Sequence, residues 1–96
     1  MLTWVVYDIA KDRTRNRVAR RCLDFGLYRV QKSVFLGDLE PNRVDEILLF
    51  SRDLLDLETD SVYIFPICRA DFERVRIVGQ GFDRELVADE VLTKVI

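Results

Sequence analysis

The sequence predicts one α+β domain, a plait of the β-α-β-β-α-β type whose antiparallel four-stranded sheet is covered by helices on one face. Two observations support this class. Short runs of aromatic and β-branched residues alternate with segments of helical spacing. The chain of 96 residues is long enough for one core, and its apolar fraction of 49% is enough to fill it.

The first strand is expected over residues 2–8, because Trp4 to Tyr7 are aromatic or β-branched and Asp8 ends the run. A helix should follow over 12–25. Gly26 is placed to end it in the left-handed conformation that glycine adopts at low cost. The apolar side of this helix is expected to be Val18, Ala19, Cys22 and Phe25.

Residues 28–36 alternate in polarity, so we expect a second strand there. Its mostly polar side should lie on the sheet face that no helix covers, where it would form a binding platform or a dimer interface. That side carries Arg29, Gln31, Ser33 and Phe35.

The remaining elements are predicted by Pro41 at a helix start and by apolar periodicity after it. They are a helix to about residue 57, a third strand over 61–68 that is interrupted near Pro66, a turn or short helical turn over 70–73, and a fourth strand over 75–78. The chain order is thus β-α-β-α-β-β, which we assign to the split β-α-β, ferredoxin-like plait.

The domain is expected to comprise residues 1–80, and the last segment lies outside it. Residues 81–96 form a tail in which 91–96 alternate, which suits a fifth strand on the edge of the same sheet or of a partner's sheet.

The composition excludes several classes of site. The chain has no histidine, which removes imidazole bases, Ser-His-Asp and Cys-His nucleophiles, and ordinary zinc sites. Cys22 and Cys68 are far apart among apolar neighbours, so both are expected in the core. No apolar run reaches eighteen residues and the N-terminus has no signal-peptide pattern, so a cytoplasmic location is expected.

The charge is uneven along the chain. Residues 1–32 hold eight basic and three acidic side chains, whereas residues 33–96 hold seven basic and fourteen acidic ones. Such a basic first third is typical of a nucleic-acid surface, although a solvated helix face gives the same pattern. The arginines expected on the outer side of the first helix are Arg13, Arg17, Arg20 and Arg21.

Asp8 at a strand end, followed at once by this basic segment, suits a site that holds Mg²⁺ and a polyanion together. Arg15 falls in the apolar stripe of the helix. Because a half-buried arginine needs a partner, it either pairs with a carboxylate such as Asp8 or faces a phosphate.

Several of these segments together resemble the CRISPR-associated protein 2 family. The resemblance covers nearly the whole chain and lies in residues 7–9 (Tyr-Asp-Ile), 15–18 (Arg-Asn-Arg-Val), 25–27 (Phe-Gly-Leu), 29–35 (Arg-Val-Gln-Lys-Ser-Val-Phe) and Gly37.

This resemblance implies a ferredoxin-like homodimer in which the C-terminal strand packs on the partner protomer. Two copies of Asp8 would bind Mg²⁺, or Mn²⁺ in its place, across the two-fold axis. It also implies a nuclease of single-stranded RNA or double-stranded DNA that partners the integrase, CRISPR-associated protein 1, in spacer acquisition for antiviral defence. The matched nuclease residues are Tyr7, Asp8, Arg15, Arg17, Arg29, Ser33 and Phe35.

Two function classes remain open from the sequence. In one, the chain is a metal-dependent endonuclease in which Arg15, Arg17 and Arg29 hold phosphate oxygens and Phe35 stacks or packs nearby. In the other, it is a non-catalytic DNA-binding scaffold for the integrase. An RNA-binding module is a weaker third class, because the sheet lacks a pair of stacking aromatic residues. The expected nucleic-acid contacts are Arg13, Arg15, Arg17, Arg20, Arg21 and Arg29.

Overall fold

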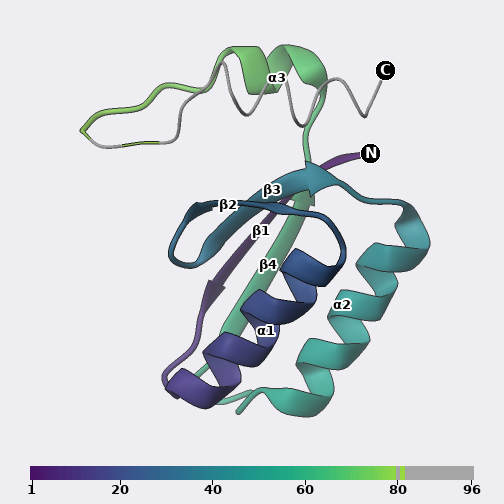
Figure 1. Ribbon diagram of the computed structural model, residues 1–96, viewed down its shortest axis with the longest axis vertical. Helices are drawn as coiled ribbons and strands as arrows, with labels where there is room; N and C mark the ends of the chain where they lie inside the picture. The colour runs from purple at the N-terminus through teal and green to yellow at the C-terminus, as the bar shows by residue number, and fades with distance from the viewer. Residues whose placement is uncertain (80, 82–96) are drawn as a thin grey trace.

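The computed structural model describes residues 1–79 and 81 of the chain. Its first six elements follow each other as β-α-β-β-α-β and form two layers, with a short third helix beyond the end of the sheet (Figure 1). The predicted α+β plait is therefore confirmed. The elements are β1 (Leu2–Asp8), α1 (Asp12–Asp24), β2 (Tyr28–Gln31), β3 (Val34–Asp38), α2 (Pro41–Leu54), β4 (Ser61–Pro66) and α3 (Arg69–Glu73).

The sheet has four strands in the order β2-β3-β1-β4, and each neighbouring pair is antiparallel. β1 is therefore an inner strand, with Val6 opposite both Val34 of β3 and Tyr63 of β4. Asp8, its last residue, lies opposite Ser61. The sequence thus places a carboxylate at the end of an inner strand.

Both long helices pack side by side on one face of the sheet (Figure 1). The buried side of α1 is Val18, Ala19 and Cys22, as the periodicity predicts. Gly26 has a φ of 81°, and its N–H donates to the carbonyl of Leu23. The helix thus ends in the expected left-handed glycine.

The second predicted strand is wrong in extent. Residues 28–36 are not one strand: β2 ends at Gln31, the chain turns at Lys32 and Ser33, and β3 begins at Val34. A nine-residue strand is longer than the usual five or six residues, and the polar pair at its centre is where the chain reverses.

The predicted fourth strand is also wrong. Residues 75–78 carry no strand in the part of the chain that the structure describes, and Val78 is fully exposed there. The β2–β3 hairpin supplies the fourth strand instead. Strand 61–68 ends at Pro66, as expected for a residue without an N–H. The short helix α3 follows, which is the helical alternative predicted for residues 70–73.

The faces of the hairpin differ from the prediction as well. Phe35 is completely buried in the core beneath the helices, and Arg29, its partner across the hairpin, has its guanidinium over the Phe35 ring. The prediction that these two lie on the uncovered face is therefore wrong. The alternation itself holds, since Tyr28, Val34 and Leu36 share the opposite face, but the more polar side of the hairpin is the one that lies beneath the helices.

The other sheet face carries Trp4, Tyr28, Val34 and Leu36, and Phe72 of α3 packs over one end of it. Tyr63 and Phe65 of the edge strand β4, opposite Val6 and Trp4 of β1, are 61% and 43% exposed. This partly uncovered, largely apolar face is called the open face below.

The two cysteines differ. Cys22 is fully buried, as expected, but Cys68 is exposed, which corrects the expectation that both lie in the core. Its sulfur caps α3 by accepting a hydrogen bond from the N–H of Asp71.

The predicted fifth strand at 91–96 lies outside the described residues. Among those described, no helix has the length and apolar character that crossing a membrane requires.

Candidate active site

Asp8 is an exposed carboxylate at the end of β1. Tyr7 before it points into the core beneath the helices, so the alternation of a strand directs Asp8 to the open face. Among residues 1–79 and 81, its carboxylate makes neither an ion pair nor a hydrogen bond. The carboxylate is thus available to a ligand.

The loop after Asp8 is held by Asp60, which the sequence pattern does not single out. Its Oδ1 accepts a hydrogen bond from the N–H of Ala10 at 3.0 Å, and its Oδ2 accepts one from the N–H of Asp56. The hydrogen bond from Ala10 is the main cause that lowers the pKa of the Asp60 carboxyl. Asp60 therefore fixes the loop that leads from Asp8 to α1.

Tyr7 is a core residue with a polar end. Its side chain is 4% exposed, and its ring stacks on that of Phe35 with centroids 6.2 Å apart. Its hydroxyl donates to the carbonyl of Lys32 at 3.2 Å. Burial raises the pKa of the Tyr7 phenol, against the opposing charge of Arg29, so the group stays protonated as a donor.

The Lys32 carbonyl also accepts hydrogen bonds from Arg29, at 3.1 Å from Nε and 2.6 Å from Nη2. One backbone step on, the carbonyl of Ser33 accepts the N–H of Tyr7 at 3.1 Å. The turn between β2 and β3 is therefore fixed from two sides, and it lies beside the end of β1. Tyr7 and Arg29 act here by holding this turn.

A basic pocket of about 570 Å³ opens at this turn, and Arg15, Arg29, Lys32 and Ser33 line it. Arg15 does not pair with Asp8: its ion pair is with Asp12, and its Nη1 donates to the carbonyl of Ile9 at 3.1 Å. Three cationic side chains around one hydroxyl suit a phosphate group. Arg15 therefore takes the carboxylate alternative, with Asp12 in place of Asp8, and its side chain also lines this pocket at the same end of the sheet as Asp8.

Phe35 cannot serve as a surface for bases in this conformation, because its side chain is 0% exposed. The sequence left open whether Phe35 stacks on a base or packs inside the protein, and in the structure it packs inside the protein.

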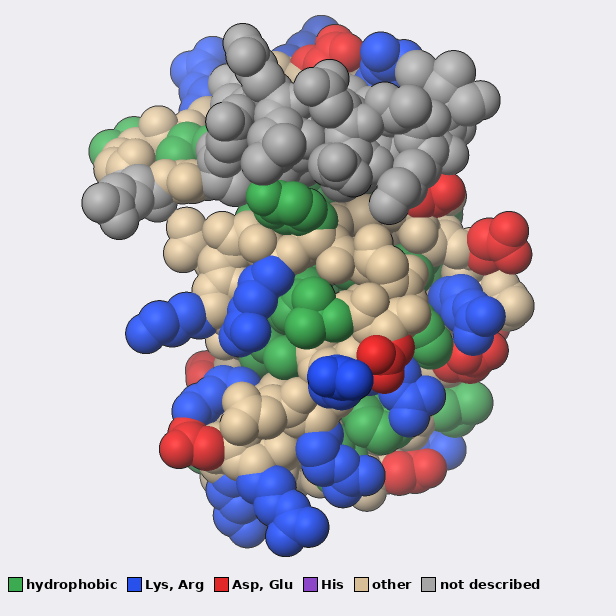
Figure 2. Space-filling model, in the orientation of Figure 1, with side chains coloured by type: hydrophobic (Ala, Val, Ile, Leu, Met, Phe, Trp, Pro, Cys, Tyr) green, Lys and Arg blue, Asp and Glu red, His purple; other side chains and the backbone are tan. Residues whose placement is uncertain are grey.

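The remaining arginines lie on α1, on the helix-covered side of the sheet. Figure 2 shows Lys and Arg side chains spread over this face, with acidic side chains among them. Arg20 pairs with Asp24 at 3.3 Å, while the guanidinium of Arg21 lies 4.3 Å from the ring centre of Phe50 on α2. Arg13 is exposed near the start of the helix.

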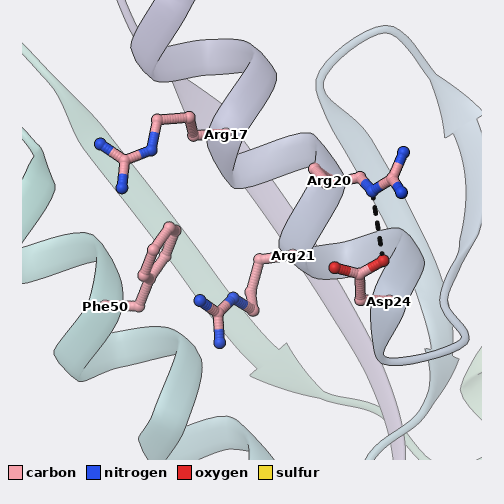
Figure 3. A pocket seen from close by; sticks show the side chains of 5 residues that line it. All are labelled: Arg17, Arg20, Arg21, Asp24 and Phe50. Atoms are coloured by element: carbon pink, nitrogen blue, oxygen red, sulfur yellow. Dashed lines mark ion pairs between the residues drawn. The ribbon is translucent and has the colours of Figure 1, made fainter.

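The predicted site residues therefore separate into two places. Asp8 and the basic pocket lie at one end of the sheet, whereas Arg17, Arg20 and Arg21 line a groove between the two long helices (Figure 3). Lys32 and Phe50 were missed by sequence reasoning. Lys32 could have been found as the basic residue of a polar turn, but nothing in the sequence distinguishes Phe50 from a core residue.

The residues present fit a weakly held hard cation. Asp8 offers oxygen donors, which Mg²⁺ prefers, but no cluster of three potential metal ligands occurs in residues 1–79 and 81. Because Mg²⁺ keeps several waters and often uses one or two carboxylates, a single Asp8, or one from each of two chains, is compatible with it.

The comparisons with known proteins identify relatives of the chain. Residues 1–75 match the family described as CRISPR associated protein Cas2. A protein named CRISPR-associated endoribonuclease Cas2 from Desulforudis audaxviator is 39% identical over 71 residues, which cover 74% of this chain and 67% of that protein. A protein of the same name from Korarchaeum cryptofilum is 40% identical over 80 residues, covering 80% and 83% of the two chains.

The fold is matched by solved structures as well. The crystal structure of Streptococcus pyogenes Cas2 superposes with a TM-score of 0.71 at 28% identity, and the match covers 82% of this chain and all of that one.

Proposed function

The chain belongs to the CRISPR-associated protein Cas2 family, and on that premise we propose that it is a metal-dependent endonuclease of CRISPR adaptation in which Asp8 holds the metal ion. The observation that carries the proposal is the state of Asp8: an exposed carboxylate, without a partner among the described residues, at the end of an inner strand. Its curated relatives are named endoribonucleases, so RNA is the first substrate to test.

The basic pocket supplies the substrate-binding part of this proposal. Arg15, Arg29 and Lys32 would hold phosphate oxygens, and the Ser33 hydroxyl would donate to one of them. Tyr7 and Arg29 keep the Lys32 carbonyl in place, so they orient the turn on which the pocket depends. Without histidine in the chain, a Mg²⁺ ion at Asp8 would supply charge neutralisation and a lowered pKa of bound water.

We also propose a homodimer across the open face. Tyr63 and Phe65 are large exposed side chains there, and a second copy over them would bring two Asp8 carboxylates to one cleft. Residues 91–96 alternate and would add apolar contact: burying about 300 Å² per tail is worth on the order of 7 kcal/mol before ordering entropy is subtracted. Sedimentation of the full chain and of a chain ending at Gln80 tests this. The truncated chain should be monomeric at protein concentrations at which the full chain is still a dimer.

The central experiment replaces Asp8 by Asn, which removes the charge and keeps the shape. We expect loss of metal-dependent cleavage with an unchanged fold. Asp45→Asn is the matched control, since Asp45 is an exposed carboxylate on α2. Both variants are assayed on single-stranded RNA and on duplex DNA across a series of Mg²⁺ and Mn²⁺ concentrations. Turnover by Asp8→Asn equal to that of the control would rule out the enzyme proposal.

A second candidate function, the DNA-binding scaffold for the integrase, is favoured by one observation. The arginines of α1 lie on the helix-covered side of the sheet, whereas Asp8 faces the other side, so DNA bound along α1 would not need Asp8. Changing Arg13, Arg17, Arg20 and Arg21 to alanine should flatten the dependence of log K on log salt by roughly 0.9 for each phosphate that the protein no longer neutralises. An unchanged slope would place duplex DNA elsewhere.

A further inference from the structure

The groove between α1 and α2 contains an alternating series of guanidinium groups and aromatic rings. Arg17 lies 5.8 Å from the ring centre of Phe50, and Arg21 lies 4.3 Å from the same ring and 5.8 Å from that of Phe25. Arg43 lies 4.8 Å from the Phe25 ring. Figure 3 shows the Phe50 ring between the side chains of Arg17 and Arg21.

Phe50 is accessible from two sides, although it is half-buried against the core. One hollow of about 180 Å³ is lined by Phe50 with Arg17, Arg20, Arg21 and Asp24. A neighbouring hollow of about 210 Å³ is lined by Phe50 and Arg17 with Asp53 and Leu54. The ring and Arg17 therefore separate a strongly basic hollow from one with a mixed lining.

The charges of this groove are only partly neutralised. Arg20 is paired with Asp24, but neither Arg17 nor Arg21 pairs with a carboxylate in the part of the chain that the structure describes. Two guanidinium groups held against an aromatic ring, without a counter-ion, suit an anionic ligand that also has a flat apolar face. The nucleotides of a single strand have both, since a base can stack while its phosphate pairs with arginine.

We propose that this groove binds single-stranded nucleic acid, with one base stacked on Phe50 in the mixed hollow and the adjacent phosphate held by Arg17 and Arg21. A duplex cannot use Phe50 in this way, because its bases are already stacked on each other. The groove lies on the opposite side of the sheet from the open face that Asp8 points toward, so it is a second binding site and not part of the metal site.

This proposal does not depend on catalysis by the chain. It is therefore tested in the Asp8→Asn background, where binding can be measured without cleavage. The probes are 12-nucleotide RNA and DNA single strands that carry one 2-aminopurine, and the same sequences as duplexes. The variants are Phe50→Leu, which keeps an apolar side chain against the core, and Phe50→Tyr, which keeps the ring.

Phe50→Leu should weaken single-strand binding by roughly tenfold for RNA and DNA alike and reduce the quenching of 2-aminopurine, while duplex affinity is unchanged. Phe50→Tyr should bind as the parent does, which separates loss of stacking from loss of folding. Leu49→Ala is the control on the same helix, with a side chain 52% exposed. Single-strand affinity of Phe50→Leu equal to that of the control, or an equal loss for duplex, would overturn the proposal.

Discussion

Replacing Phe35 with alanine tests whether this residue serves the fold or the substrate. The side chain is 0% exposed and lies within the main core cluster. Burying a phenylalanine removes about 150–250 Å² from water, worth about 4–6 kcal/mol at 25 cal/mol per Å². Measured Phe→Ala losses in cores are about 3–5 kcal/mol, and the contact with Arg29 adds roughly 0.5–1 kcal/mol.

A domain of this length has a free energy of unfolding of roughly 5–14 kcal/mol, so Phe35→Ala should lose a large part of it. Urea denaturation at one fixed protein concentration measures the loss, since a dimer's apparent stability depends on concentration. Leu57→Ala, whose side chain is 68% exposed, is the control and should change the free energy of unfolding by about 0.5 kcal/mol or less.

Phe35→Leu separates the two roles, because it keeps most of the core contact and removes the ring. The packing account predicts near-normal cleavage by this variant at a temperature where it is fully folded. A stable Phe35→Ala protein, with a loss below about 1 kcal/mol, would refute the burial reasoning. A stable but inactive Phe35→Leu protein would instead assign the ring to the substrate.

Two further predictions rest on single side chains. Tyr7→Phe removes the hydroxyl that donates to the Lys32 carbonyl, so the free energy of unfolding should fall by about 1 kcal/mol and substrate should bind more weakly, as urea denaturation and a binding titration would show. A thiol reagent near pH 8 should label Cys68 and spare Cys22 in the native protein, since burial raises the pKa of the Cys22 thiol to about 12. Because the unfolded thiol ionises first, this contribution to stability is full below about pH 8.5 and is lost as the pH rises toward 12. Equal labelling of both thiols would contradict the burial of Cys22.

The sequence predicted correctly those helices and strands whose apolar residues recur with a clear helical or strand spacing. The apolar stripe of α1, its glycine end and the short strand that closes with Asp8 all lie where the residues place them. The β2–β3 hairpin was missed because its turn, Lys32-Ser33, has neither glycine nor proline and continues the polar alternation of the strands. Residues 75–78 look like a strand, but strand pairing depends on tertiary contacts that local composition does not contain.

The candidate site was predictable in its residue types and less so in its contacts. Asp8 and Arg15 were found from their positions, but the partner of Arg15 is Asp12 and not Asp8. Arg15 can pair with Asp12 within the first turn of the helix or with Asp8 on the preceding strand, and the sequence does not show which of the two ion pairs forms. The placement of Phe35 under the helices reverses the two sides of the predicted strand, and alternation alone does not show which side of a strand meets the helices.

The central claim is that the Asp8 carboxylate holds the metal ion for cleavage, and exchanging the ligand atom tests it most directly. Asp8→Cys replaces hard oxygen donors with a soft thiolate, which binds Mg²⁺ poorly and Cd²⁺ well. Cleavage of single-stranded RNA by Asp8→Cys is measured in Mg²⁺ alone and with added Cd²⁺, beside the unmodified chain and Asp8→Asn under the same conditions. The account predicts no cleavage by Asp8→Cys in Mg²⁺ and recovery with Cd²⁺ that Asp8→Asn does not share. Full activity of Asp8→Cys in Mg²⁺ alone would contradict it.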